Sequence, residues 1–324
     1  MPKRAELHNH LGAAVDPPIM WAIAHEQGIR LPFKNYWDFE DLITIDFEEH
    51  YNTVAQVDKE LFHWTELIQS SPSAVEMSVK TIFGGGYRKC NITTHEVRFN
   101  PMKRNRGGEQ DLDHIIMAAL RGMDKAVLEY SQVKAGLILM MDRTFTPQLN
   151  EIILNKALKY QNRGIVGIDL AGPQSKKFKL KNYIKLFNIA KKKGLGITMH
   201  TGEEGNIKEM KEVVKYIVPD RIGHGFLAYK DHDLMKELKR KKITLELCPT
   251  SNLKCGVIES VELMKKIYQT LYKNGLQLTI NTDGPEMYKT NIYKEQELTI
   301  DHEIFTKKQI NEFMKNSFQA TFIK

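Results

Sequence analysis

The sequence has little of what marks several classes of protein. Its 324 residues include three cysteines, Cys90, Cys248 and Cys255, without a CxxC pair, which argues against a disulfide framework and fits a reducing compartment. The longest nearly unbroken apolar run, Ala135 to Met141, is far shorter than the roughly 20 residues that a bilayer crossing needs. The opening MPKRAELHNH has no apolar region behind its basic residues, so no secretory signal is expected. We therefore expect a cytoplasmic protein with no membrane partner.

Linkers, internal repeats and low-complexity tracts are also missing, so nothing in the composition divides the chain. A content of 42% hydrophobic and 27% charged residues excludes disorder and collagen, because enough apolar side chain is present to fill a large core. Lysine and arginine number 47 against 40 aspartates and glutamates. The excess lies in short clusters such as Lys191-Lys192-Lys193, without interleaved aromatic residues, so no nucleic-acid partner is expected.

A short β-like run followed by a longer helical pattern recurs along the chain. Eight runs have the character of buried strands: Ala5–Leu7, Thr94–Phe99, Ala135–Met140, Val166–Leu170, Gly196–Met199, Arg221–Gly223, Thr244–Leu247 and Gln277–Ile280. Amphipathic segments lie between several of them: Gln148–Tyr160, Leu180–Lys192, Lys208–Ile217, Asp233–Arg240 and Val261–Tyr272. Strands that alternate with helices indicate parallel βα units. The pattern predicts an α/β fold, a single (β/α)8 barrel of the TIM type formed by residues 1–324 as one domain.

Extra helical length lies between the first two strand candidates. Three segments there are predicted to be helical: Pro18–Gln27, roughly Glu48–Ser70, and Ala74–Phe83. We expect these extra helices to cover the carboxyl-terminal mouth of the barrel, with Trp37, Phe39 and Trp64 as candidate apolar residues of a pocket. Near the other end of the chain, Thr306-Lys307-Lys308-Gln309 predicts a capping box that opens the last helix.

Polar and titratable residues directly follow five of the strand candidates. The first leads into His8-Asn9-His10, and side chains two apart on a strand point to the same face, so both imidazoles can reach one metal ion. Four further segments have the same form: Thr198–Glu203, Arg221–Gly225, Glu246–Asn252 and Ile280–Pro285. The ends of all strands in a βα barrel share one rim, so residues from both ends of the chain converge on one site.

Three histidines and an aspartate at that rim, with a further glutamate and histidine, are the set of residues expected at a hydrolytic zinc site. Nitrogen and oxygen ligands with an open position for water suit Zn²⁺, and an acid and a base beside the metal suit hydrolysis. Taken one at a time, His224 could be a satisfied polar residue, Asp283 a helix cap and Glu203 a first-turn carboxylate. These alternatives do not explain why all of them follow successive strands.

The chain resembles the adenosine deaminase family, metal-dependent aminohydrolases of the amidohydrolase superfamily with a (β/α)8 barrel. The matching segments run in the family's order from Pro2 to the final helix: PKRAELHNHLGAA, EVRFNP, GIDLAG, HTGEEG, RIGHG, LELCPTSN and NTDGP. The resemblance implies a zinc-dependent hydrolytic deaminase that converts adenosine or 2′-deoxyadenosine to inosine and ammonia. It also implies one Zn²⁺ per chain, held by four ligands: His8, His10, His200 and Asp283.

The resemblance also implies roles for residues beside the metal. Glu203 would protonate the purine ring at nitrogen 1, and His224 would act as the base toward the attacking water and relay its proton with Asp283. The backbone N–H of Gly172 would meet purine nitrogen 3, and His10 would contact the substrate as well as the metal. Two further residues would orient the ligands: Glu246 and Ser251.

Two departures from the family concern substrate contacts. Adenosine-specific members have an aspartate, associated with the ribose, where this chain has Gly12. They have a second aspartate, associated with purine nitrogen 7, where this chain has Gly284. Both groups read the substrate and neither performs the chemistry, so adenine, an AMP-like nucleotide or a 5′-modified adenosine is the alternative substrate.

Two rival functions stay open. A two-metal amide or phosphotriester hydrolase on the same barrel usually has a carbamylated lysine or a carboxylate near the fourth strand, and Gly167-Ile168-Asp169-Leu170 has no lysine at its end. A binding protein that has kept the fold would have no need of Glu203 and His224 together. The other zinc deaminase architecture, with His-x-Glu and Pro-Cys-x-x-Cys, is absent. The oligomeric state is not predicted.

Overall fold

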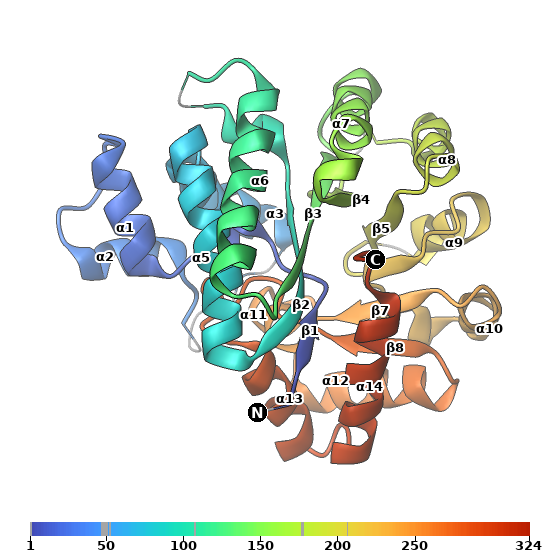
Figure 1. Cartoon of the computed structure of the whole chain (residues 1–324). Helices are drawn as coiled ribbons and strands as arrows, with labels where there is room; N and C mark the ends of the chain where they lie inside the picture. The colour runs from blue at the N-terminus through green and yellow to red at the C-terminus, as the bar shows by residue number, and fades with distance from the viewer. Residues whose placement is uncertain (1, 47–50, 52, 107, 176–177, 206) are drawn as a thin grey trace.

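Eight parallel strands curl into a nearly closed barrel in the computed structural model, which describes every residue except 1, 47–50, 52, 107, 176–177 and 206 (Figure 1). The strands follow one another around the sheet in chain order: β1 Arg4–Glu6, β2 Ile92–Phe99, β3 Lys134–Asp142, β4 Ile165–Ala171, β5 Gly196–Thr201, β6 Arg221–His224, β7 Thr244–Leu247 and β8 Gln277–Ile280. Every strand lies within two residues of its predicted bounds. The predicted (β/α)8 barrel is confirmed.

The first and last strands meet through the residues that follow them. Asn9 and Asp283 form a parallel bridge beyond the ends of β1 and β8. The amide of Asp283 donates to the carbonyl of His8 at 2.8 Å, and the amide of His10 donates to the carbonyl of Asp283 at 2.8 Å. The buried carboxylate of Glu6 accepts from the amide of His8 at 3.0 Å. The contacts that close the barrel are therefore made by predicted metal ligands.

Helices cover the outside of the barrel and connect its strands (Figure 1). They are α5 Pro72–Cys90, α6 Leu112–Glu129, α7 Pro147–Lys159, α8 Ile184–Lys192, α9 Ile207–Tyr216, α10 His232–Arg240, α11 Pro249–Lys254, α12 Val261–Lys273, α13 Ile292–Asp301 and α14 Lys307–Ala320. The predicted segments correspond to α7, α9, α10 and α12, whereas the segment from Leu180 splits into a 3-10 turn and α8. The capping box of Thr306 and Gln309 is confirmed at the start of α14. In the described part of the chain, none of the helices combines the length and apolar character that a membrane span requires.

Helix α5 continues well past its predicted end at Phe83. It runs through Gly84-Gly85-Gly86 to Cys90, although each glycine in a helix interior costs roughly 1 kcal/mol relative to alanine. Close packing against α6 offsets this cost. A Cβ on Gly122 of α6 would lie 2.4 Å from the carbonyl oxygen of Glu76 on α5, so the backbones of the two helices come into direct contact there.

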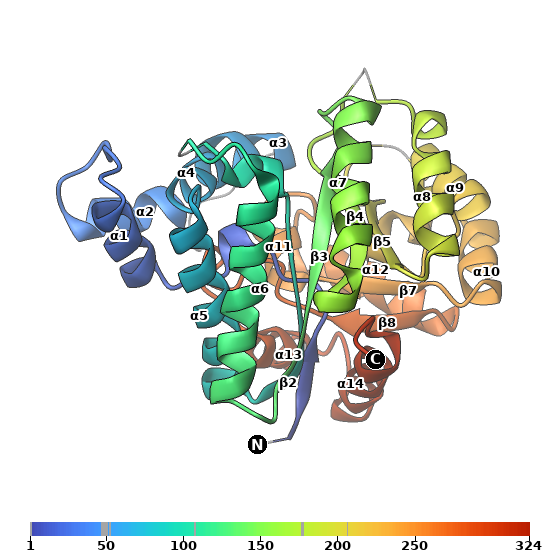
Figure 2. The same cartoon turned by 45° about the horizontal axis from the view of Figure 1, so that its top comes forward.

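The segment between β1 and α5 contains α1 Pro17–Glu26, α2 Tyr36–Ile43, α3 Val54–Val57, the π-helical turn η2 Asp58–Phe62 and α4 His63–Ile68. The last three elements cover the mouth of the barrel as predicted, whereas α1 and α2 lie to one side of it (Figure 2). The start of the predicted helix Glu48–Ser70 lies outside the described residues. The expectation for three aromatic residues is wrong: Trp37 is 72% exposed, Phe39 is in the core beside Trp21, and Trp64 packs against the same core. Tyr36 and Phe39 of α2 pack against Trp21 of α1.

The carboxyl-terminal tail plugs the opposite end of the barrel. Phe322 packs on Gly167 of β4 and Gly196 of β5, which are paired, and a Cβ on Gly196 would lie 2.2 Å from its ring. The guanidinium carbon of Arg221 lies 3.6 Å from the centre of the Phe322 ring. The amide of Phe322 donates to Glu96 at 2.6 Å. The two glycines therefore make room for an aromatic side chain from the end of the chain.

We predict that Phe322→Ala lowers the free energy of unfolding by about 2 kcal/mol, because the glycines beneath the ring have no side chains to fill the space. Urea denaturation followed by circular dichroism measures this. Phe318→Ala is the matched control, since Phe318 is 37% exposed on α14 and its loss is expected to cost less than about 1 kcal/mol. Equal losses of unfolding free energy in the two variants would contradict the proposed packing role of Phe322.

Candidate active site

Three histidine rings direct nitrogens at one point in the mouth of the barrel. The Nε2 atom of His10 lies 3.3 Å from Nε2 of His8 and 3.2 Å from Nε2 of His200. Asp283 joins the group through Oδ1, which is 3.2 Å from Nε2 of His10 and 3.6 Å from Nε2 of His8. The ends of β1, β5 and β8 thus bring the four predicted ligands together.

Buried carboxylates determine which nitrogen of two histidines faces this group. Nδ1 of His8 lies 2.7 Å from Oε2 of Glu246, and Nδ1 of His200 lies 3.0 Å from Oδ2 of Asp169. An ionised carboxylate only accepts hydrogen bonds, so Nδ1 carries the proton in both rings. Nε2 of each ring therefore presents its lone pair to the centre of the group, as a metal ligand requires.

The separations between the nitrogens fit a single shared cation. A metal about 2.0–2.1 Å from each nitrogen places neighbouring nitrogens roughly 3.3–3.4 Å apart, and the two measured separations are 3.3 and 3.2 Å. Burial lowers the pKa of His10 well below its usual value, so its ring is neutral and has a lone pair to share. Three nitrogens and one carboxylate oxygen are ligands that Zn²⁺ accepts.

Two buried arginines keep the supporting carboxylates ionised. Arg98 contacts both of them, through Nη1 to Asp169 at 3.0 Å and through Nη2 to Glu246 at 2.9 Å. Arg221 pairs with the other oxygen of Glu246. Burial alone would raise the pKa of each carboxyl group, but the guanidinium groups and the histidines hold both pKa values well below their usual range. The positive charges of the two arginines thus balance the negative charges of the two carboxylates that contact the histidines.

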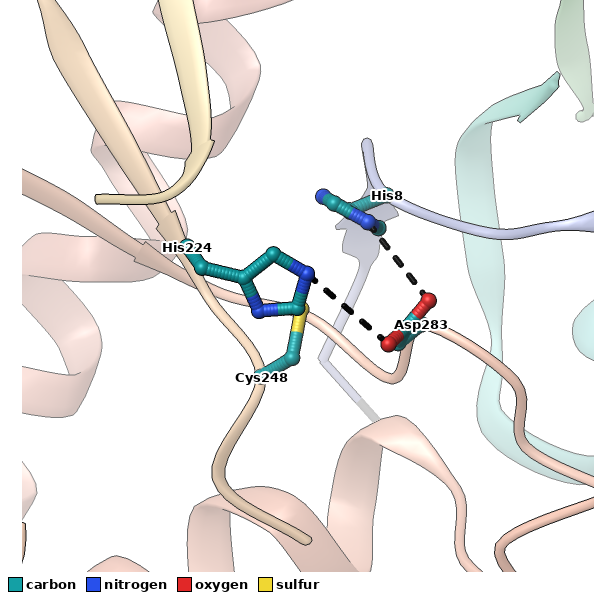
Figure 3. A group of neighbouring side chains, drawn as sticks. All are labelled: His8, His224, Cys248 and Asp283. Atoms are coloured by element: carbon teal, nitrogen blue, oxygen red, sulfur yellow. Dashed lines mark ion pairs between the residues drawn. The ribbon is translucent and has the colours of Figure 1, made fainter. Parts of the chain in front are cut away.

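Glu203 and His224 lie beside the ligand group. Nε2 of His224 is 3.6 Å from Oε1 of Glu203. The same nitrogen is 3.9 Å from Oδ2 of Asp283 (Figure 3). Nδ1 of His224 is 2.9 Å from Oδ1 of Asn252, which turns Nε2 toward the group. The hydroxyl of Ser251 donates to Oδ2 of Asp283 at 2.5 Å and leaves Oδ1 facing the histidines.

Two of these residues have a strained backbone. His224 has a φ of +61° and Asp283 a φ of +62°, in the left-handed region, which costs a residue with a side chain about 1–2 kcal/mol. His224 ends β6, and Asp283 follows shortly after β8. The sharp turn aims each side chain at the ligand group. At Asp283 the backbone hydrogen bonds to His8 and His10 hold this conformation.

Cys248 lies close enough to His8, His224 and Asp283 to be considered as a ligand (Figure 3). Its thiol donates to the carbonyl of Glu246 at 3.7 Å. Burial raises the pKa of this thiol well above its usual value, and a protonated thiol is a poor metal ligand. The set of three histidines and Asp283 is therefore the better metal site.

A pocket extends from the ligand group toward the cover. Val54, Val57 and Phe62 line it from the cover, while His10, His200 and Asp283 line it at the ligand group. Gly172 also lines the pocket and has a φ of +93°. A Cβ there would lie 2.9 Å from the carboxylate of Asp142, so only glycine fits.

Neighbouring side chains occupy the space beside two glycines of the site. A Cβ on Gly284 would lie 2.4 Å from the Cβ of Ala13. A Cβ on Gly12 would lie 3.0 Å from the ring of Phe62 and 3.2 Å from Nη2 of Arg104. The two departures from the family pattern are therefore part of the packing, and neither leaves an open space.

Asp169 and Asn252 contact the Nδ1 atoms of His200 and His224, and the sequence analysis predicted no role for either residue. Both residues stand in segments that carry the family resemblance, GIDLAG and LELCPTSN, but each supports a histidine on another strand. Arg98 was likewise not assigned. Local patterns cannot reveal such partners, because the pairing exists only after the barrel has closed.

The family model described as adenosine deaminase matches residues 2–324, and it places this barrel among the hydrolytic deaminases. The chain belongs to the adenosine deaminase family. A relative named adenosine deaminase, from Clostridium kluyveri, is 27% identical over 328 residues, which cover 98% of this chain and 89% of the relative.

Solved structures with the same fold carry the names of different enzymes. An adenine deaminase from Arthrobacter aurescens has a TM-score of 0.86 at 18% identity, over 100% of this chain and 95% of its own. The Arabidopsis N6-mAMP deaminase has a TM-score of 0.84 at 23% identity, over 99% and 94%. An amidohydrolase from Burkhoderia ambifaria with bound zinc has a TM-score of 0.82 at 20% identity, over 99% and 86%. At these identities the likeness establishes the fold.

We predict that Gly284→Asp alone destabilises the protein by about 1–3 kcal/mol, because the new Cβ collides with Ala13. Adding Ala13→Gly removes the collision and should recover most of the loss. Urea denaturation measures the free energy of unfolding of the wild type, the two single variants and the double variant, which together form a double-mutant cycle. We expect a coupling free energy between the two substitutions of at least about 1 kcal/mol. Effects of the two substitutions that simply add would contradict a collision between Gly284→Asp and Ala13.

Proposed function

We propose that the protein is a Zn²⁺-dependent deaminase that replaces the 6-amino group of a purine nucleoside, adenosine or 2′-deoxyadenosine, with oxygen and releases ammonia. The main support is the convergence of three imidazole nitrogens and Asp283 beside Glu203 and His224 at the base of a pocket. Family membership and the name of the C. kluyveri relative support the reaction. Adenine, an AMP-like nucleotide or a 5′-modified adenosine is the alternative substrate, because of Gly12 and Gly284.

One Zn²⁺ per chain would be held by Nε2 of each histidine, His8, His10 and His200, and by Oδ1 of Asp283. Bound zinc supplies a nucleophile at neutral pH, since it lowers the pKa of its water to about 7. The zinc in the B. ambifaria structure supports this choice of metal. Glu246, Asp169 and Ser251 would hold the ligands in place through the contacts described above, as is common around metal-binding histidines.

His224 would receive the proton of the attacking water. Its Nε2 faces Oδ2 of Asp283 at 3.9 Å, and Asn252 holds the ring in that orientation, so an attacking water that contacts both side chains could pass its proton to either of them. A positioned base of this kind typically contributes roughly 10²- to 10⁴-fold in rate. Gly172 would place its backbone N–H at purine nitrogen 3, and His10 would contact the substrate from the ligand group.

Glu203 would donate a proton to nitrogen 1 of the purine. Attack at carbon 6 pushes electrons onto that nitrogen, and a proton delivered there removes the negative charge as it develops. Glu203 lines the pocket, and its carboxylate is 3.6 Å from His224, on the same side of the pocket as the base. The proton collected by His224 can then reach the departing amine.

The proposal is tested by an ammonia-release assay of the purified, zinc-loaded protein. The panel contains adenosine, deoxyadenosine, adenine, AMP and 5′-modified adenosines. Release from adenosine or deoxyadenosine supports the proposed substrate, and preference for another member supports the alternative. Absence of release across the whole panel would overturn the proposed activity and favour a binding protein.

We predict that Glu203→Gln retains zinc and loses most of its turnover, whereas His200→Ala loses both. The amide keeps the shape of the side chain but cannot deliver the proton, and the alanine removes a ligand. Ammonia release and metal content per chain separate the two outcomes. Turnover of Glu203→Gln within about tenfold of the wild type would contradict the role in ring protonation.

We predict that Asp169→Asn weakens zinc affinity by about 10- to 100-fold, because the amide no longer fixes the proton of His200 on Nδ1. Competition with a chelator measures the affinity. Asp233→Asn serves as the control, since the side chain of Asp233 is 90% exposed on α10. An unchanged affinity in Asp169→Asn would show that His200 is oriented by other contacts.

A further inference from the structure

The guanidinium group of Arg143 is buried among the strand ends that carry the site. Arg143 directly follows β3, and its side chain is only 2% exposed. Nη1 donates to the carbonyl oxygens of Leu170 at 3.3 Å and of Gly172 at 3.4 Å. Nη2 donates to the carbonyl oxygen of His200 and, at 2.7 Å, to Oε1 of Glu209 on α9. One side chain therefore binds the turn after β4, the end of β5 and α9.

The backbone of Arg143 contacts the same turn after β4. Its amide donates to the carbonyl oxygen of Ala171 at 3.0 Å. With the two bonds from Nη1, three consecutive carbonyl groups, those of residues 170, 171 and 172, accept hydrogen bonds from this one residue. Gly172 has a φ of +93°, so the turn follows a course that few residues other than glycine can adopt. Arg143 holds the turn in that course.

These contacts determine the direction of the N–H group of Gly172. The peptide between Ala171 and Gly172 is trans, so its N–H points opposite to its carbonyl group. Because the carbonyl oxygen of Ala171 accepts from the amide of Arg143, the N–H of Gly172 points away from the end of β3. The proposed function assigns this N–H to purine nitrogen 3. Rotation of the peptide would remove the donor from that position.

A guanidinium group suits this set of partners. It has five N–H donors in one plane, whereas the ammonium group of lysine is a compact charge at the end of a flexible chain. Glu209 balances the charge of Arg143, and the ring centre of Phe178 lies 5.4 Å from the guanidinium carbon. Both contacts help to fix the plane of the group, so its donors stay directed at the carbonyl oxygens.

We propose that Arg143 is a positioning residue that holds the N–H of Gly172 and the backbone of His200 at a fixed spacing. This inference rests on the proposed function. Nitrogen 3 and carbon 6 are opposite each other across the six-membered ring of a purine. The donor for the first atom and a ligand of the metal beside the second are both bound to Arg143. Arg143 is not among the described residues that line the pocket at the ligand group, so it acts through these two residues.

The test compares adenosine with 3-deazaadenosine, in which a C–H group replaces ring nitrogen 3. The ratio of kcat/KM for the two compounds is measured on the zinc-loaded wild type and on Arg143→Lys. The difference in ring reactivity between the compounds is the same in both proteins, so it cancels when the two ratios are compared. We expect the ratio to fall at least about fivefold in Arg143→Lys, because a misdirected N–H no longer binds nitrogen 3. Where 3-deazaadenosine is not turned over, its inhibition constant against adenosine replaces its kcat/KM.

Arg4→Lys is the matched control. Arg4 is 4% exposed and also donates to backbone carbonyl groups, those of Cys90 at 3.2 Å and Pro2 at 3.3 Å. It begins β1 and so lies at the end of the barrel opposite the site. This variant should keep the wild-type ratio even if it lowers stability. Zinc content is measured in every variant, so that loss of metal is not mistaken for a change in purine binding.

Glu209→Gln is the second variant, for the case that Arg143→Lys fails to fold. The side chain of Glu209 is 17% exposed, and the amide is a weaker partner for the guanidinium than the carboxylate. The group then keeps its donors and loses part of its orientation. We expect the ratio to fall by about two- to threefold in this variant.

The inference is overturned if the wild-type ratio is unchanged in a folded Arg143→Lys or, failing that, in Glu209→Gln. It is also overturned if Arg4→Lys lowers the ratio as much as Arg143→Lys, or if the wild type binds the two compounds equally tightly. Absence of adenosine turnover in the wild type contradicts the proposed function instead. Calorimetric binding of the two compounds to the same proteins then applies the comparison, and absence of adenosine binding overturns both.

Discussion

The structure depends on the buried carboxylate of Glu246 on β7. It is within hydrogen-bonding distance of His8 after β1, Arg98 on β2, Thr198 on β5 and Arg221 on β6, and so connects five parts of the barrel at its centre. Removing such a carboxylate would leave the arginine charges buried and uncompensated. The same group keeps the proton of His8 on Nδ1 and leaves Nε2 free. Formation of the barrel core and preparation of a metal ligand are therefore one event.

The strands and the grouping of His8, His10, His200 and Asp283 were predictable because each depends on local information. An apolar run of a few residues bounded by polar ones marks a buried strand, and a histidine directly after such a run must lie on the rim of a barrel. The features that were missed depend on contacts between distant segments. Helix α5 crosses three glycines because α6 packs against it, and Phe322 finds its place only once Gly167 and Gly196 are paired.

The residues that support the histidines also depend on contacts between distant segments of the chain. Arg98 and Arg221 are both nearly fully buried, although arginine is normally among the exposed residue types. Their burial is possible because Glu246, Asp169 and Glu96 lie within reach on other strands. Nothing in the sequence around either arginine indicates these partners. The kind of chemistry could be inferred from the residue types that follow the strands. The buried arginines that keep the supporting carboxylates ionised, and so orient the histidines, could not.

Backbone strain is found at two residues of the site. His224 and Asp283 adopt left-handed backbone conformations. Each costs roughly 1–3 kcal/mol in a chain whose total stability is expected to be about 5–15 kcal/mol. Both side chains lie together at the rim beside His8, so the strain is found where the side chains have to be aimed at one point. Strain of this kind persists where the surrounding structure enforces it, and at Asp283 the backbone hydrogen bonds to His8 and His10 do so.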